Sequence, residues 1–234
     1  MPYPQSTLEE IVDSERAMFV DAAARYGQHY THARDTTMLL SNCIVRIEKK
    51  DRSRIFGRLF SLMKKQHTLA FLSTLRLHRV QAMMNLRQVL EAGGAAAYAI
   101  ANPKLEDFVD IDAFGIMDPS QKLTRKRYRW LDEKYPLASE RIKKAKDDLN
   151  TFSTHANVIT GDSTFSDVGH GVSLPFFDRE DDYSVKIDLW LISSLANSLM
   201  DLFYSVANDI VTATGRSVVT SCKSFNAWLT RKGR

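Results

Sequence analysis

The chain has few of the residues that mark common catalytic and scaffold motifs. Its 234 residues include two cysteines, Cys43 and Cys222, which lie far apart in sequence. This excludes a disulfide framework and a zinc site of paired cysteines, and a reducing compartment fits best. The sequence also has no glycine-rich phosphate loop, no nucleophile elbow and no His-Glu zinc helix. We therefore expect no metal and no cofactor.

Targeting and membrane segments are also missing. Residues Met1 to Glu10 contain no basic stretch followed by an apolar core, so we expect no secretory signal. The stretch Leu189 to Ala207 is apolar, but Asn197 and Asp201 interrupt it. We interpret it as a buried amphipathic helix and not as a membrane span. The expected protein is cytoplasmic, without membrane association.

The sequence is rich in apolar residues at helical spacing. Hydrophobic residues make up 44% of the chain and charged residues 26%, which is enough to bury a core in one domain. The apolar positions recur at intervals of three and four, which is typical of one face of a helix. We expect a single domain over residues 1–234 with an all-α fold, an up-and-down bundle of long antiparallel helices.

The helix boundaries follow from caps and breakers. Ser6 and Glu9 form a capping-box pattern for a first helix to about Lys50, which Gly27 and residues 31–37 can kink or divide. A second helix is expected without interruption over residues 54–101. Later helices are expected over residues 119–134, 136–158, 185–210 and 217–230, with Asp118 and Pro119 starting the first of them.

One long loop is expected within the bundle. Residues 159–183 are rich in glycine, proline, serine and aspartate, which is typical of irregular structure. Within this loop, residues 168–177 are compatible with a short β-hairpin. Residues 104–118 have no sustained period, and we interpret them as an ordered connection.

Charged residues interrupt the apolar stripe of the second expected helix. Arg76, Arg87 and Glu91 fall on or beside it, and a charge placed there must be paired or must line a cleft. Arg87 and Glu91 are four residues apart and share a helix face, so they can form an ion pair. A purely structural pair is one interpretation, and a polar binding or catalytic cleft is the other.

A second polar group lies near the end of the helix that begins at Pro136. Ser153, His155 and Asn157 would converge only if the helix unwinds there. A histidine can act as general acid or base, or can cap a helix C-terminus. We place six residues in one polar cleft: Arg76, Arg87, Glu91, Ser153, His155 and Asn157. Arg87, Glu91 and His155 are its candidates for catalysis.

A basic cluster predicts a nucleic-acid surface on two consecutive helices. Its members are Arg125, Lys126, Arg127, Arg129, Lys143 and Lys144. Tyr128 and Trp130 lie between these charges, where they either stack on bases or turn into the core. The net charge of +4 is compatible with nucleic acid but does not demonstrate it. RNA is therefore one expected partner, and an ordinary solvated face is the alternative.

With the arginines from Arg76 onward and the segment Ser153 to Asn157 in view, the chain resembles uncharacterised bacterial all-helical proteins related to the HEPN group. The resemblance spans about Arg76 to Ile210. It implies a helical bundle, a bacterial setting, a homodimer, and ribonuclease activity in a toxin-antitoxin or antiphage system. The active site of that group is an arginine followed after four to six residues by a histidine. No arginine precedes His155 at that spacing, whereas Arg25 and His32 match it.

Three readings from different classes remain open at this point. The first is a module that binds a ligand or partner in the polar cleft, the small-molecule ligand being unknown. The second is a metal-independent HEPN-like ribonuclease, in which a histidine deprotonates a ribose hydroxyl and an arginine stabilises charge on phosphate. A structural oligomer with a helix contact at Gly93, Gly94 and residues 95–97 is a third reading. The sequence does not decide whether the protein is an enzyme.

Overall fold

The computed structural model describes residues 7–44, 54–153, 166–167, 172–173, 176–178 and 181–214. The described part is helical, with two short antiparallel strand pairs, which confirms the predicted all-α fold. The long elements are α1 (Leu8–Tyr26), α2 (Gln28–Ile44), α3 (Arg54–Leu75), α4 (Arg79–Ala101), α5 (Gln121–Lys134), α6 (Pro136–Ser153) and α8 (Asp182–Thr214).

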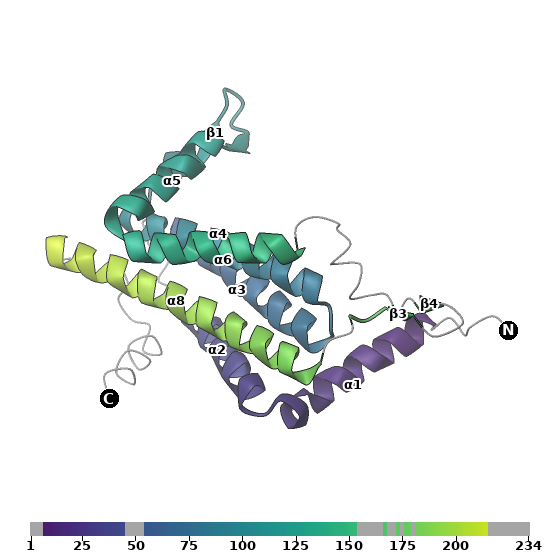
Figure 1. Cartoon of the computed structure of the whole chain (residues 1–234). Helices are drawn as coiled ribbons and strands as arrows, with labels where there is room; N and C mark the ends of the chain where they lie inside the picture. The colour runs from purple at the N-terminus through teal and green to yellow at the C-terminus, as the bar shows by residue number, and fades with distance from the viewer. Residues whose placement is uncertain are drawn as a thin grey trace.

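Helix α4 lies at the centre of the molecule and packs against α3, α8, α6 and α5 (Figure 1). It is buried on nearly all sides because its second half, Val89 to Ile100, consists largely of small and apolar residues. The adjoining core between α3 and α8 contains Phe56, Phe60 and Phe203, whose rings contact one another edge to face or stacked. Aromatic packing of this kind adds to the stability gained from burial alone.

The first expected helix is divided at Gly27. Glycine there has a φ of +54°, a left-handed conformation that other residues avoid, so α1 ends and α2 begins in a new direction. The capping box is formed by Thr7 and Glu10, each one residue after the expected pair. The expected kink or division is therefore confirmed. Residues 45–53, which include the expected end near Lys50, lie outside the described part.

The prediction of one uninterrupted helix over residues 54–101 is wrong. The chain reverses at residues 76–78, and α4 runs back along α3. The amide of Leu77 donates to Thr74 O, and the amide of His78 donates to Ser73 O. These two bonds form a Schellman motif that ends α3. Leu77 occupies the left-handed position of this motif with a φ of +57°, where glycine is the usual residue. Because the turn contains neither glycine nor proline, the sequence pattern does not indicate it.

Contacts from distant segments hold this reversal in place. The Asp178 amide donates to Leu77 O, and its carboxylate accepts from the amide of Arg79 at the start of α4. On the other side, Glu15 of α1 accepts from His78 and Arg76 at 2.8 and 3.2 Å. The hydrogen bond with His78 lowers the pKa of Glu15, burial opposes it, and the charge of Arg76 lowers it further. The turn is thus stabilised by tertiary contacts and not by local sequence.

The connection after α4 contains a β-hairpin that the sequence pattern did not predict. A short helical turn, η2 (Leu105–Asp107), precedes strands β1 (Val109–Ile111) and β2 (Met117–Pro119), which pair antiparallel. Asp118 and Pro119 therefore belong to a strand, and Ser120 caps α5 in their place, with its hydroxyl accepting from the Leu123 amide. The expected start of the next helix at Pro136 is confirmed.

The expected long loop is described only in part. Strands β3 (Ser166–Asp167) and β4 (Val172–Ser173) pair antiparallel. Strand β4 lies within the hairpin expected at residues 168–177, and β3 lies just before it. Helix α8 follows, and its buried positions from Val185 to Val206 match the expected apolar stripe. The helix expected at residues 217–230 lies outside the described residues.

Helix α8 is, within the described segments, the one helix long and apolar enough to cross a membrane. Half of the most apolar stretch of α8 is buried inside the protein. A buried core helix meets the same criterion, so α8 is weak grounds for a membrane span.

Candidate functional site

The site begins with the ion pair expected on α4. Arg87 Nε lies 3.3 Å from Glu91 Oε1, one helical turn away. The same carboxylate oxygen lies 3.1 Å from Lys146 Nζ, which comes from α6. Glu91 therefore joins two cations from two helices. Both Arg87 and Glu91 have side chains about one third exposed, so this network opens to water.

Lys146 has a second partner, which comes from α5. Its ammonium donates to the Tyr128 hydroxyl at 2.8 Å and also lies 4.9 Å from the centre of the Tyr128 ring. Burial on its own would lower the pKa of Lys146, but the hydrogen bonds and charges of Tyr128 and Glu91 outweigh it and leave the pKa above its usual value. Lys146 is therefore a firmly protonated, mostly buried cation at neutral pH.

These residues line a cavity of about 180 Å³ between α4, α5 and α6. The lining residues are Glu91, Gly94, Ala95, Thr124, Arg127, Tyr128, Leu131 and Lys146. Gly94 and Ala95 form the α4 wall, where small side chains leave the space open. The cavity thus combines one carboxylate with two cations and the Tyr128 hydroxyl, a set of groups suited to polar and anionic molecules. The Thr124 hydroxyl already donates to Ser120 O.

Arg127 is the second cation of this cavity. Its guanidinium donates to Thr124 Oγ1 at 3.0 Å and to Asp107 O at 3.4 Å, and it lies over the ring of Phe108. Burial lowers the pKa of Arg127, although a guanidinium stays charged at neutral pH in any protein site. These contacts fix the guanidinium in place, so it presents positive charge to the cavity without having to be ordered first.

The other residues of the expected polar cleft do not all join this cavity. Arg76 lies in the reversal between α3 and α4 and binds Glu15, eleven positions along the chain from Arg87. The side chain of Ser153, and all of His155 and Asn157, lie outside the described residues. The structure therefore places Glu91 in the wall of this cavity, with Arg87 paired to it, and gives Arg76 a different set of contacts.

The expected nucleic-acid residues have mixed surroundings. Lys126 and Lys143 form ion pairs of 2.6 Å with Asp107 and Asp132, and Arg127 faces the cavity. Exposed positions remain at Arg125, Arg129 and Lys144, which pair with no other described residue. The interleaved aromatics are engaged by the protein itself: Tyr128 binds Lys146, and Trp130 packs edge to face on Tyr98. The aromatic side chains thus follow the alternative reading, in which they pack against the protein.

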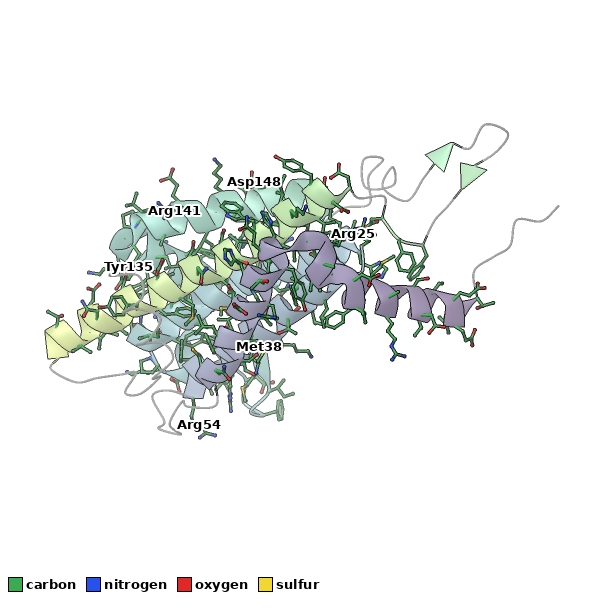
Figure 2. All side chains as sticks on the ribbon, turned by 90° about the horizontal axis from the view of Figure 1, so that it is seen from below. Arg25, Met38, Arg54, Tyr135, Arg141 and Asp148 are labelled. Carbon is green, nitrogen blue, oxygen red and sulfur yellow. The ribbon has the colours of Figure 1, made fainter. Side chains whose placement is uncertain are left out.

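The two residues that match the HEPN spacing lie on different helices. Arg25 is in the last turn of α1 and His32 is in α2, with the break at Gly27 between them. The Arg25 guanidinium lies 2.6 Å from the Asp182 carboxylate at the start of α8. Arg25 and Tyr135 lie toward opposite ends of the bundle (Figure 2). Neither Arg25 nor His32 is among the residues that line the cavity at Glu91.

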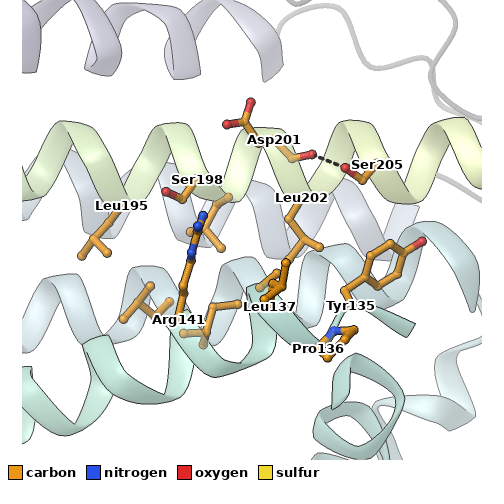
Figure 3. A pocket seen from close by; sticks show the side chains of 13 residues that line it. Tyr135, Pro136, Leu137, Arg141, Leu195, Ser198, Asp201, Leu202 and Ser205 are labelled. Atoms are coloured by element: carbon orange, nitrogen blue, oxygen red, sulfur yellow. Dashed lines mark hydrogen bonds between the residues drawn. The ribbon is translucent and has the colours of Figure 1, made fainter. Parts of the chain in front are cut away.

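A larger, apolar groove of about 370 Å³ lies between α6 and α8 (Figure 3). Its walls are mainly leucine and isoleucine: Leu90, Leu137, Ile142, Leu195, Leu199 and Leu202. Arg141 extends from α6 toward Ser198, while the Asp201 carboxylate points to the other side of α8 (Figure 3). Tyr135 closes one end and donates to Asp209 at 2.7 Å. The groove is apolar at its base and carries a cation at its mouth.

Sequence reasoning missed Lys146 as a partner of Glu91 and Tyr128 as a partner of Lys146. Both belong to the basic and aromatic residues of α5 and α6, which the sequence pattern predicts to lie on the surface. The signal that could have found them is the small-residue stretch from Gly93 to Ala97, which marks a place where a neighbouring helix approaches. Among the described residues, no group of three or more His, Cys, Asp or Glu side chains is placed to hold a metal ion.

Comparison of this chain with protein-family models, with curated proteins and with solved structures finds no match. The HEPN resemblance therefore stays a prediction from sequence.

Proposed function

We propose that this protein is a binding module that takes a small anionic ligand in the cavity between α4, α5 and α6. The observation that carries the proposal is Lys146, a mostly buried and protonated lysine that lines the cavity together with a second fixed cation, Arg127. Glu91 balances one of these charges and is itself shared with Arg87. The site therefore has an excess of positive charge for an anion to neutralise.

The ligand class follows from the donors. The Lys146 ammonium, the Arg127 guanidinium and the Tyr128 hydroxyl are hydrogen-bond donors suited to carboxylate or phosphate oxygens. The cavity is several times the volume of a water molecule but below the usual range for drug-sized ligands, which favours a small oxyanion or the anionic group of a larger molecule. Binding is expected to remove water from a partly enclosed site, where charge-assisted hydrogen bonds are stronger than on the surface.

The test is heat unfolding of the full chain with inorganic phosphate, with sodium chloride added to a matched ionic strength in the reference samples. A ligand that binds the folded state raises the midpoint with the logarithm of its concentration above Kd. We expect phosphate to raise the midpoint in the native chain. Lys146→Met should abolish this rise, because one of the two cations that line the cavity is lost.

Lys144→Met is the matched control. Lys144 lies on the same helix, carries the same charge, and is exposed without an ion pair to another described residue. The control variant should keep the full response to phosphate. Equal loss in both variants, or no response in the native chain to phosphate, acetate or pyrophosphate, would contradict binding at this cavity.

The ribonuclease alternative gains no comparable support. Arg25 is neutralised by Asp182, and His155 lies outside the described residues. It stays a prediction that RNA cleavage would be lost in His155→Ala or His32→Ala.

A further inference from the structure

An apolar finger projects from the molecule next to α5. It consists of residues 109–119, the β1–β2 hairpin, and Figure 1 shows it at the outer end of α5, away from the layer formed by α4 and α6. Four large apolar side chains are exposed within seven residues of one another: Ile111, Phe114, Ile116 and Met117. Phe114 is 89% exposed. Apolar residues that gather in this way on a protruding element are typical of contact surfaces.

The finger has a well-defined conformation. At its tip the Asp112 carboxylate accepts from the amides of Phe114 and Ile116 at 2.9 and 2.8 Å, and Gly115 takes a φ of +78°. At its base Phe108 packs edge to face on Tyr98 of α4. The exposed Phe114 is therefore held by an ordered turn on an anchored stem. A side chain fixed in this way loses little conformational freedom when it is buried by a partner.

The finger also carries unbalanced negative charge. Asp110 and Asp118 lie directly opposite each other in the strand register, and both are exposed. Like charges at opposed positions destabilise a strand pair. A cation placed against this face would relieve the repulsion. The finger thus offers an apolar edge and tip together with an acidic face, and it fits a surface that is apolar with a cation at its rim.

The groove between α6 and α8 has this complementary character. Its base is leucine and isoleucine, Arg141 stands at its mouth, and Lys144 lies one turn further along α6. Leu137, on its rim, is 71% exposed. The groove begins at Tyr135, where α5 ends, whereas the finger is attached where α5 begins. Fourteen helical residues span about 20 Å, so the finger does not reach the groove of its own chain.

We infer that two copies of this chain associate by seating the finger of one copy in the α6–α8 groove of the other. Phe114 and Ile116 enter the apolar base, and Asp110 and Asp118 face Arg141 at the rim. The contact uses different surfaces on the two copies, so it can be reciprocal in a dimer or can extend to larger assemblies. It is separate from the Glu91 cavity, and its test does not depend on anion binding.

The test is light scattering of the full chain as its concentration is raised to millimolar. The native chain is expected to exceed the monomer mass. Phe114→Ser removes the tip of the finger, and Leu137→Asp places a charge in the groove that repels the finger. Both positions are exposed, and an acidic residue in the first turn of α6 favours the helix, so both variants should fold. Each variant alone is expected to stay monomeric, while Val12→Ser, another exposed apolar position, should behave like the native chain.

Mixing the two variants gives the sharpest result. Phe114→Ser keeps an intact groove and Leu137→Asp keeps an intact finger, so the mixture has one working contact and should form a one-to-one dimer and nothing larger. A mixture that stays monomeric while the native chain associates would overturn the inference, because the contact would then lie elsewhere. It would also be overturned by a native chain that is monomeric at every concentration. The inference would also be overturned if decanoate, a small amphipathic probe, occupied the groove without lowering the mass of the assembled native chain.

Discussion

The two sides of α4 are packed in opposite ways. Toward α8, a methyl group added at Gly93 would lie 2.5 Å from Leu199 Cδ1, closer than atoms can approach. Toward α5, a methyl group added at the next residue, Gly94, would lie 3.6 Å from Leu131 Cδ1, an ordinary contact. At Gly93 the α8 side is interlocked without room for a methyl group, as protein interiors generally are. The α5 and α6 side keeps a cavity lined with charges.

Titratable residues on the two sides behave accordingly. His67 of α3 is fully buried beside α2 and α8, contacts Thr37 Oγ1 at 3.3 Å through Nδ1, and has no hydrogen-bond partner for Nε2 among the described residues. Burial lowers the pKa of His67 to about 4, against a weak opposing interaction with the Ile192 backbone. On the other side, partners keep the pKa of Lys146 high. Burial decides the charge where partners are few, and partners decide it where they are present.

The largest expected effect comes from acid acting on the α8 side. The unfolded chain protonates His67 below its usual pKa of 6.5, whereas the folded chain keeps it neutral to about pH 4. The unfolded state therefore binds more protons in this window, and stability falls as the pH is lowered, by about 1.4 kcal/mol per unit and about 3 kcal/mol in total. The measurement is urea denaturation at intervals between these two pH values.

His67→Gln separates this contribution from other groups that titrate in the same range. The variant lacks the proton uptake, so its stability should depend less steeply on pH between 6.5 and about 4. His32→Gln changes an exposed histidine on α2 and is expected to leave the slope of the native chain in place. Parallel profiles of unfolding free energy against pH for the native chain and His67→Gln would show that protonation of His67 is not what destabilises the protein in acid.

The second prediction compares the two glycines directly. Gly93→Ala forces a methyl group against Leu199 and should cost about 1 to 3 kcal/mol of unfolding free energy. Gly94→Ala has room for the methyl group and gains helix propensity, so it should be neutral or more stable by up to about 1 kcal/mol. Denaturant unfolding of both variants measures the difference.

A double variant tests the cause. Leu199→Ala should cost less in the Gly93→Ala background than in the native chain, because the smaller side chain relieves the overlap. Additive losses would mean that Gly93 is required for a reason other than its contact with Leu199. Equal effects of the two glycine variants would remove the distinction between the sides of α4.

The sequence predicted the fold class because helical periodicity is local and repeated. The stripe of α8 and the breaks at Gly27 and Pro136 are all visible as spacing or as special residues. The reversal at Leu77 is not visible in this way, because a leucine fills the position where glycine is usual and the contacts that stabilise it come from Glu15 and Asp178. Tertiary contacts outweigh local preference at this point, and no single-sequence pattern records them.

The candidate site was predicted in part for the same reason. The Arg87–Glu91 pair is a spacing of four on one helix, so it could be expected from sequence, and the structure contains it. Lys146 and Tyr128 lie 55 and 37 positions after Glu91. Lys146 reaches the Glu91 carboxylate, and Tyr128 reaches Lys146, only because α5 and α6 fold back against α4. The finger was missed because its strands are three residues long, too short for an alternating pattern to be recognised.

The smallest expected effect is on the polar side. Arg87→Ala removes one partner of Glu91, but Lys146 remains 3.1 Å from the same carboxylate oxygen, so Glu91 keeps a counter-charge. The pair is partly exposed and has the weaker order, with arginine before glutamate, so the loss should be about 0.5 kcal/mol or less. Denaturant unfolding of Arg87→Ala and of Arg87→Ala with Lys146→Met measures it. The second substitution should cost more in the Arg87→Ala background than alone, because only then does Glu91 lose both of these cations. Simple additivity would mean that the two cations do not act through one carboxylate.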